Sequence, residues 1–235
     1  MRKVNKRRYL LAFIISAAIF FIGFFFGFLM DLQRINYFQE VNDVNQINIR
    51  SLQLQSEWVK SSTGPNQCAA SRVIFNKAII ELEQNRERLE LYDQQSKVRS
   101  TDFEMLKRQY TLSQINFLII AKNLKEFCPN SSDFVTVIYF YSDNAKCPEC
   151  ADQATVLNYY KTLLKENLLI FAIDEQLESQ EPIIGILKQT YGVSSYPTLV
   201  VGDTVLNTYV DKEKMRSILC TDYNATYPEL GCSMP

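Results

Sequence analysis

The sequence predicts a mixed α/β fold, in which a sheet with helices on its faces follows a helical region and a transmembrane helix. Three observations predict this order. Residues 9–30 contain no charge, residues 37–127 are interrupted by glycine or proline only at Gly64-Pro65, and residues 134–219 alternate between strand-like and helical patterns. The expected segments are a cytoplasmic N-terminus (1–8), an anchor (9–30), a helical region or stalk (36–128), a sheet domain (134–220) and a C-terminal tail (221–235).

The uncharged segment 9–30 is long enough to cross a membrane. As a helix its 22 residues would extend roughly 33 Å, about the thickness of the hydrocarbon core of a bilayer. A cleaved signal peptide is the alternative, but it would have a shorter apolar stretch and a small-residue cleavage site, whereas Phe-Leu-Met-Asp-Leu stands at 28–32. Five basic and no acidic residues in positions 1–8 place this end in the cytoplasm and the C-terminal part outside.

The composition excludes several classes of function. Outside the basic N-terminus the chain has more acidic than basic residues, so it lacks the positive surface that nucleic-acid binding requires. It contains no histidine, which excludes Ser-His-Asp and Cys-His catalysis and histidine-containing zinc sites, and we expect no metal. Six cysteines fit disulfides in an oxidising compartment, and Asn130 and Asn224 each begin a glycosylation sequon in a predicted loop. With histidine-dependent catalysis excluded, the nucleophilic chemistry that remains is that of the six cysteine thiols.

The helical region contains three predicted helices, the first from about residue 37, the second from about 69 to 95 and the third from 101 to 127. If they run up, down and up again, Cys68 and Cys128 meet at one end and form a disulfide across a helical stalk. Cys220 and Cys232 then pair and hold the tail to the last helix. One apolar stripe of the third helix predicts packing: Phe103, Leu106, Tyr110, Phe117, Ala121 and Leu124.

The sheet domain has the predicted order β-α-β-α-β-β-α. Its first strand is the apolar run 134–142, and a Gly202-Asp203 turn connects the last two strands as a hairpin. The other predicted elements are helices at 148–165, 181–191 and 212–219, and strands at 168–174, 198–201 and 205–210. This order gives a mixed sheet with helices on its faces.

The motif Cys147-Pro148-Glu149-Cys150 lies between the first strand and the following helix. Unpaired N–H groups and the positive end of the helix dipole stabilise a thiolate there, so Cys147 is the predicted nucleophile. The two-residue spacer lets Cys150 attack a mixed disulfide at Cys147, which makes Cys150 the resolving thiol. Lys146 would lower the pKa of the Cys147 thiol and Glu149 would raise it. The alternatives are an inert bridge and half of a metal site, although no second CxxC is present.

A second motif, Tyr196-Pro197-Thr198-Leu199, opens the predicted hairpin. Together with the preceding strand, CPEC motif and helix, it resembles the thioredoxin superfamily over roughly residues 134–220. The resemblance implies that Pro197 is cis and lies against the CxxC motif, and that the backbone of Tyr196 binds an extended substrate chain; an ordinary turn proline is the alternative.

Two features depart from the thioredoxin pattern. Tyr139 stands where thioredoxins bury an acid, which leaves Glu149 or Asp143 as substitute proton acceptors for Cys150. The first strand–helix pair of the family is absent, and the long helical region stands in its place.

These motifs predict a membrane-anchored, extracytoplasmic thiol–disulfide oxidoreductase that acts on protein disulfides through Cys147 and Cys150, with no cofactor besides that couple. The expected partners are exported thiol or disulfide proteins and a redox partner that resets the dithiol. The alternative is a non-catalytic scaffold on the same fold, with the helical region as its interaction surface. Gly23 and Gly27, one helical turn apart in the anchor, would also allow a homodimer. The direction of electron flow stays open.

Overall fold

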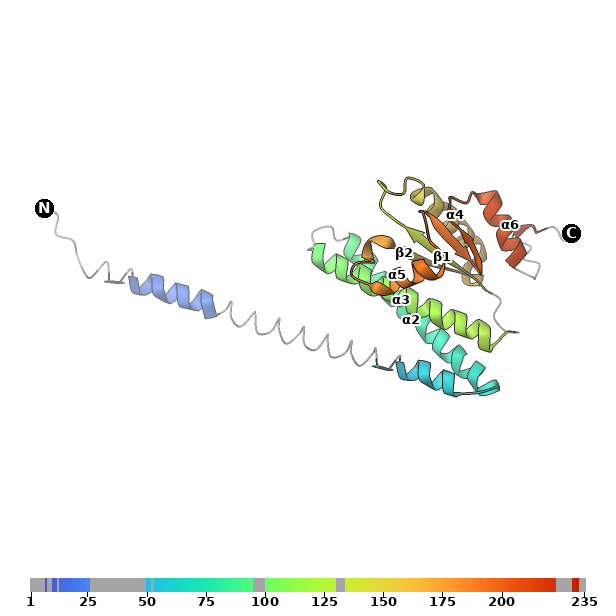
Figure 1. Cartoon of the computed structure of the whole chain (residues 1–235). Coiled ribbons are helices and arrows are strands. Elements are labelled where there is room, and N and C mark those ends of the chain that lie inside the picture. Colours follow the sequence, from blue (N-terminus) through green and yellow to red (C-terminus); the bar gives the residue numbers. More distant parts are fainter. Residues whose placement is uncertain are drawn as a thin grey trace. The chain divides into compact units, whose positions relative to one another are not determined.

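The computed structural model describes residues 7, 10–11, 13–25, 50–51, 53–94, 100–129, 134–222 and 230–232 of the 235-residue chain (Figure 1). These residues belong to two compact units, Met1–Ser61 and Ser62–Pro235, and each is described by itself. The predicted sites at Gly27, Asn130 and Asn224 lie outside the described residues.

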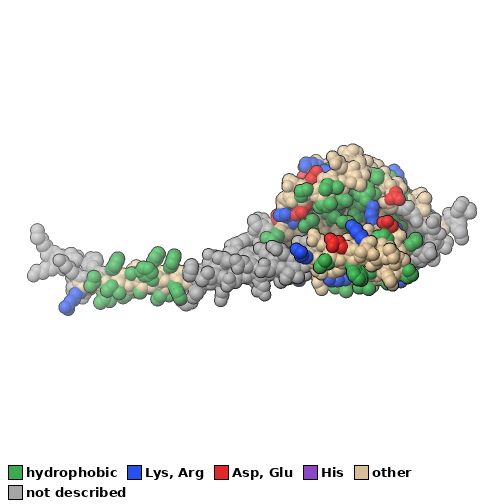
Figure 2. All heavy atoms as spheres, turned by 60° about the horizontal axis from the view of Figure 1, so that its bottom comes forward, with side chains coloured by type: hydrophobic (Ala, Val, Ile, Leu, Met, Phe, Trp, Pro, Cys, Tyr) green, Lys and Arg blue, Asp and Glu red, His purple; other side chains and the backbone are tan. Residues whose placement is uncertain are grey.

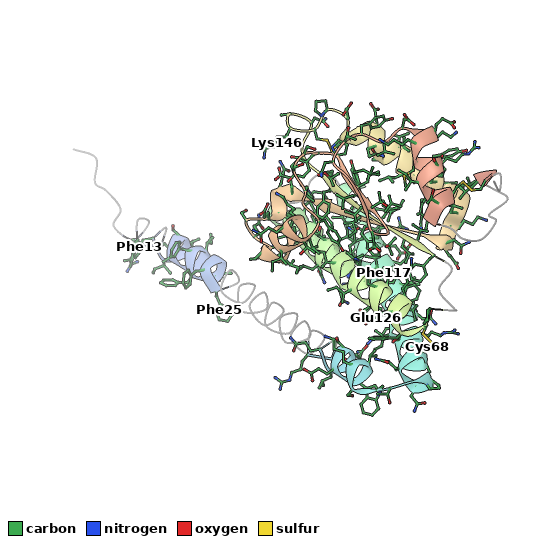
Figure 3. The ribbon with its side chains drawn as sticks, turned by 45° about the vertical axis from the view of Figure 1, so that its right-hand side comes forward. Phe13, Phe25, Cys68, Phe117, Glu126 and Lys146 are labelled. Atoms are coloured by element: carbon green, nitrogen blue, oxygen red, sulfur yellow. A yellow bond between two sulfur atoms is a disulfide. The ribbon has the colours of Figure 1, made fainter. Side chains whose placement is uncertain are left out.

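The described part of the first unit is helical, with continuous stretches at residues 13–25 and 53–61. The large apolar side chains of residues 13–25, from Phe13 to Phe25, are exposed (Figure 2, Figure 3). A Cβ placed on Gly23 would have no heavy atom within 4 Å. Within the described ranges no helix is both long and apolar enough to cross a membrane, and residues 9, 12 and 26–30 of the predicted anchor lie outside those ranges.

The second unit begins with two long helices and continues with the predicted alternation of strands and helices. Helix α2 starts directly after Gly64, whose φ of 61° suits glycine, and Pro65 takes the first helical position, where no N–H is needed. In chain order the elements are α2 (Pro65–Gln94), α3 (Ser100–Phe127), β1 (Val135–Tyr141), α4 (Cys150–Leu164), a 3-10 turn (Lys165–Asn167), β2 (Leu168–Asp174), a second 3-10 turn (Glu175–Leu177), α5 (Pro182–Thr190), β3 (Thr198–Val201), β4 (Thr204–Leu206) and α6 (Lys212–Asp222).

The strands form one mixed sheet in the order β2-β1-β3-β4. Strands β1 and β2 run parallel, with Val135 opposite Leu168, because helix α4 carries the chain back between them. Strand β3 pairs antiparallel with β1, and β4 pairs antiparallel with β3 through the Gly202 turn. The predicted β-α-β-α-β-β-α mixed sheet is therefore confirmed.

Strand β4 is shorter than the predicted strand 205–210 and ends at Leu206. The next residue, Asn207, turns its side chain towards the loop before β3. Its Oδ1 accepts hydrogen bonds from the Ser194 N–H (3.0 Å) and the Thr198 hydroxyl (2.8 Å), and its amide donates to the Gly192 carbonyl (3.2 Å). These bonds fix Asn207 to the loop, so the ladder stops there.

One face of the sheet is covered by α3 and α5, with α2 behind α3 (Figure 1). We call this the first core. Phe117 lies at its centre, with its ring centroid 5.1 Å from that of Phe75 and 5.6 Å from that of Phe171 (Figure 3). Its buried residues from α3 and the sheet include Ile115, Phe117, Leu118, Ala121, Leu124, Ile138, Phe140, Phe171, Ile173 and Val200. The helical hairpin is therefore more than the predicted stalk, because one face of α3 belongs to the core under the sheet.

Helices α4 and α6 cover the other face of the sheet (Figure 1). We call this the second core. Gln153 of α4 is fully buried and binds both backbone groups of Val210: the Val210 N–H donates to Gln153 Oε1 (2.8 Å), and Gln153 Nε2 donates to the Val210 carbonyl (3.3 Å). The buried residues of this core include Val135, Val137, Tyr139, Cys147, Cys150, Leu157, Tyr160, Leu199, Met215 and Leu219.

The outer edge of β2 is occupied by side chains from both faces. Gln114 of α3 accepts from the Ala172 N–H (2.8 Å) and donates to the Ala172 carbonyl (3.2 Å), and Lys161 of α4 donates to the Leu168 carbonyl (2.7 Å). Side chains thus satisfy backbone groups that a neighbouring strand would otherwise bind.

Two disulfides brace the second unit as predicted. Cys68 at the start of α2 is bonded to Cys128 just after α3, with a Cα–Cα distance of 5.3 Å. Cys220 in α6 is bonded to Cys232, with a Cα–Cα distance of 5.7 Å, and Leu230 next to it packs into the second core. Both predicted pairings are confirmed.

Candidate redox site

The CPEC motif lies at the junction of β1 and α4, at the carboxyl end of β1. Cys147 and Cys150 form a disulfide with a Cα–Cα distance of 5.4 Å. The Cys147 N–H donates to the Asp143 carbonyl (2.8 Å) and the Cys150 N–H donates to the Cys147 carbonyl (3.3 Å). Helix α4 therefore begins at Cys150, two residues later than predicted, and Glu149 lies exposed just before it.

Asp143 shapes the loop that leads into the motif. Its Oδ1 accepts hydrogen bonds from the backbone N–H groups of Ala145 (2.9 Å) and Lys146 (3.0 Å), and its Oδ2 accepts one from the Gln176 amide (2.8 Å). Both carboxylate oxygens thus hold the loop, and the role of Asp143 as a proton acceptor for Cys150 stays a prediction.

Lys146, which the sequence predicts to lower the pKa of the Cys147 thiol, is paired with a carboxylate in the structure. Its ammonium lies 2.9 Å from Oε1 of Glu175, which also accepts a hydrogen bond from the Ser142 hydroxyl (2.8 Å). Burial raises the pKa of Glu175, but the hydrogen bonds from Lys146 and Ser142 outweigh this and hold it below the ordinary value. The same hydrogen bond raises the pKa of Lys146. Sequence reasoning missed Glu175, because nothing in the sequence links it to a residue 29 positions away.

The two sulfurs lie in an apolar, aromatic environment. Cys147 is 0% exposed and Cys150 is 5% exposed, and both belong to the second core together with Tyr139. The Tyr139 hydroxyl donates a hydrogen bond to the Cys150 carbonyl (2.6 Å). Burial raises the pKa of Tyr139 to about 12, so the phenol stays protonated at neutral pH. Tyr139 therefore donates a hydrogen bond to the start of α4 and cannot replace the buried acid of thioredoxins as a proton acceptor.

The Tyr196–Pro197 bond is cis and directly precedes β3. Tyr196 packs against both cores, and the second of these contains Cys147 and Cys150. The Lys188 ammonium lies 5.5 Å from the centre of the Tyr196 ring, 2.6 Å from Glu178 Oε2 and 4.0 Å from Glu175 Oε2. Lys188 thus connects the loop of the cis proline to the carboxylate that holds Lys146.

The structure places Cys147, Cys150 and Tyr196 at one core, and the Cys220–Cys232 bridge also packs against that core, whereas the Cys68–Cys128 bridge does not. Figure 3 shows Cys68 and Lys146 at opposite ends of the second unit. The disulfide Cys68–Cys128 therefore lies far from the CPEC motif, as expected for a structural bridge. The features that sequence reasoning missed are Glu175, Lys188 and the hydrogen bond of Tyr139.

No family model matches the sequence, and no curated protein matches it. Two solved structures are similar to parts of it. One, described as "Structure of a malarial protein", is 18% identical over 39% of this chain and 99% of that chain, with a TM-score of 0.32. The other, described as "Crystal structure of J-Trx1 fragment of ERdj5", is 16% identical over 62% of this chain and 90% of that chain, with a TM-score of 0.33. The fold assignment rests on the strand order and register described above.

Proposed function

We propose that this chain is a thioredoxin-like thiol–disulfide oxidoreductase whose reactive groups are Cys147 and Cys150. One observation carries the proposal: a disulfide at the strand–helix junction shares a core with Tyr196, the residue before a cis proline. A disulfide at a helix N-terminus is poised for exchange, because the helix dipole stabilises the thiolate that exchange releases. No cofactor besides this couple is needed for the reaction.

The exchange runs in two steps. A substrate thiolate attacks Sγ of Cys147, the Cys147–Cys150 bond breaks, and Cys150 leaves as a thiolate. A second substrate thiolate then attacks the substrate sulfur of the mixed disulfide and releases Cys147, so the substrate loses two electrons and two protons and the CPEC pair gains them. The reverse sequence reduces a substrate disulfide. Tyr196 supplies the backbone on which an extended substrate chain would lie.

We also propose that residues 9–30 anchor the chain in a membrane, with residues 1–8 in the cytoplasm and the rest outside. The exposed apolar side chains of residues 13–25 support an apolar surrounding for this helix. The disulfides Cys68–Cys128 and Cys220–Cys232 suit an oxidising compartment. Substrates would then be exported thiol or disulfide proteins, and a separate redox partner would reset the dithiol. Use of the sequons at Asn130 and Asn224 and a homodimer through Gly23 and Gly27 stay predictions.

A second function is favoured by the burial of the disulfide. Because Cys147 is 0% exposed, the bridge could instead be inert, and the chain a scaffold on a thioredoxin-like fold. In that case the exposed surface of α2 and α3 would bind the partner.

Mixed-disulfide trapping separates these two functions. Cys150→Ala in the full chain removes the resolving thiol, so Cys147 should retain substrates as mixed disulfides that are visible on non-reducing gels and vanish with reductant. Cys147→Ala is the matched control and should trap none. Equal trapping by both variants would refute the assigned roles, and no trapping by Cys150→Ala in cells that export thiol proteins would favour the scaffold.

A further inference from the structure

We propose that the Lys146–Glu175 ion pair is a positioning device that sets the reactivity of the Cys147 thiolate, with Glu175 holding the Lys146 ammonium across the CPEC loop. This inference rests on the proposed redox function and adds to it a residue outside both motifs.

The topology brings Glu175 to the motif. Strands β1 and β2 are parallel, with Tyr141 opposite Asp174, so the residues that follow the two strands lie side by side. Ser142 follows β1 and Glu175 follows β2, and the Ser142 hydroxyl donates to Glu175 at 2.8 Å. Glu175 is thus fixed at the carboxyl end of the sheet, where the CPEC loop begins.

The carboxylate of Glu175 needs a cation there. Its side chain is only 12% exposed, and a carboxylate at such a depth is unfavourable without a partner. The neighbouring acids have their own partners, because Asp174 pairs with Lys107 and Glu178 pairs with Lys188. Lys146 at 2.9 Å is therefore the close cation of Glu175, and Lys188 at 4.0 Å is a more distant one.

Lys146 and Glu175 carry opposite charges and lie 2.9 Å apart, so their effects on the Cys147 thiolate should oppose each other. Glu175→Gln would leave the positive charge of Lys146 beside the motif and would favour the Cys147 thiolate. Lys146→Gln would leave the negative charge of Glu175 and would disfavour it. The double variant removes both charges and should behave like the wild type. A purely structural role would instead shift both single variants in the same direction.

Other charged groups around the pair are Asp143, Glu149, Asp174, Glu178 and Lys188. Glu181→Gln is the matched control, because it removes a carboxylate of equal exposure from the same loop and its partner is Arg108 rather than Lys146 or Lys188.

The experiment measures the CPEC couple in the purified full chain. The proteins are equilibrated with glutathione buffers, and the oxidised fraction of Cys147–Cys150 is read by alkylation and peptide mass mapping. For reduced protein, the pH dependence of Cys147 alkylation gives the pKa of the thiol. Thermal unfolding checks that each variant is folded, because Lys146→Gln leaves the Glu175 carboxylate with only the more distant Lys188.

We expect Glu175→Gln to shift the equilibrium with glutathione about three- to tenfold towards the dithiol and to lower the Cys147 pKa, because a stabilised thiolate stabilises the reduced form. Lys146→Gln should shift both quantities the other way, and the double variant should return to within about twofold of the wild type. The control Glu181→Gln should change them less than about twofold. Single variants that shift in the same direction, or a control shift as large as that of Glu175→Gln, would overturn the proposal. A wild-type motif that never exchanges with glutathione would instead overturn the proposed function itself.

Discussion

The two faces of the sheet share one structural feature, but only one of them contains the candidate redox site. Each contains a buried glutamine that binds both backbone groups of one residue, Gln114 with Ala172 and Gln153 with Val210. The first core is otherwise aromatic and aliphatic, and ion pairs from α3 fasten its rim. The second core contains the Cys147–Cys150 disulfide of the candidate site, and the Tyr139 hydroxyl is hydrogen-bonded to the first residue of the helix that follows it. The first core therefore contributes packing and ion pairs that stabilise the fold, and the second core also contains the candidate redox site.

The largest expected effect comes from removing the helices of the first core. A fragment that begins at residue 130 would expose the face that includes Ile138, Phe140 and Phe171 to water, and we expect it not to fold. Near-ultraviolet circular dichroism and urea unfolding test this, with a fragment from residue 62 onward as the folded control. Cooperative unfolding of the shorter fragment would show that α3 is an accessory to the sheet and not part of its core.

The two structural disulfides differ in the loops they close. Cys68–Cys128 spans 60 residues and Cys220–Cys232 spans 12. By the chain-entropy estimate, replacing the first pair by alanine should lower the free energy of unfolding by about 4 kcal/mol, and the second pair by about 3 kcal/mol. Urea unfolding of the two double variants measures the difference. A greater loss of unfolding free energy on replacing Cys220 and Cys232 would show that loop length does not determine which disulfide stabilises the fold more.

The two ion pairs at the rim of the first core should contribute differently to the free energy of unfolding. Asp174 has a side chain only 3% exposed, so Lys107→Met leaves a buried carboxylate without its cation and should cost about 2 kcal/mol or more. Arg108 pairs with Glu181, whose side chain is 12% exposed against 3% for Asp174, so Arg108→Met leaves a less deeply buried carboxylate and should cost less, about 1 kcal/mol. Denaturant unfolding measures the two losses. Equal losses in the free energy of unfolding would mean that burial of the acid does not determine the contribution of its ion pair.

The smallest effect concerns the second core. Tyr139→Phe removes one buried hydrogen bond to the Cys150 carbonyl and should lower the free energy of unfolding by about 1 kcal/mol. The pKa of Tyr139, raised to about 12, keeps the phenol protonated near neutral pH, so it takes no proton from Cys150 there. The pH–rate profile of exchange between about pH 6 and 9 should therefore keep its shape. A changed profile would show that Tyr139 takes part in proton transfer.

The sequence predicts those parts of the molecule whose signals are local. The apolar run of β1, the glycine turn before β4 and the helix after Cys147 each follow from neighbouring residues, and the Cys68–Cys128 pairing follows from two helix lengths. The stripe on the third helix predicted packing, and Phe117, Ala121 and Leu124 of that stripe are indeed buried.

What the sequence cannot predict depends on contacts between distant segments. In the sequence, Glu175 is one acidic residue of a polar segment. It lies next to Lys146 because β1 and β2 are parallel and end side by side. Similarly, Gln114 reads as a polar residue on an amphipathic helix, but it is 3% exposed and bound to a strand 58 residues later. The end of β4 depends on the side chain of Asn207, whose partners lie in the preceding loop.

The side chains on the outer edge of β2 also bear on the behaviour of the protein in concentrated solution. An open strand edge is a template on which a strand of another molecule can pair, and it is a common origin of aggregates. Gln114 is hydrogen-bonded to both backbone groups of Ala172, and Lys161 donates to the carbonyl of Leu168. These backbone groups are therefore not free to pair with a strand of another molecule. One of these side chains belongs to α3, a helix held to the sheet by packing and by ion pairs. Release of α3 would therefore open this edge to other chains while the strands themselves were still paired.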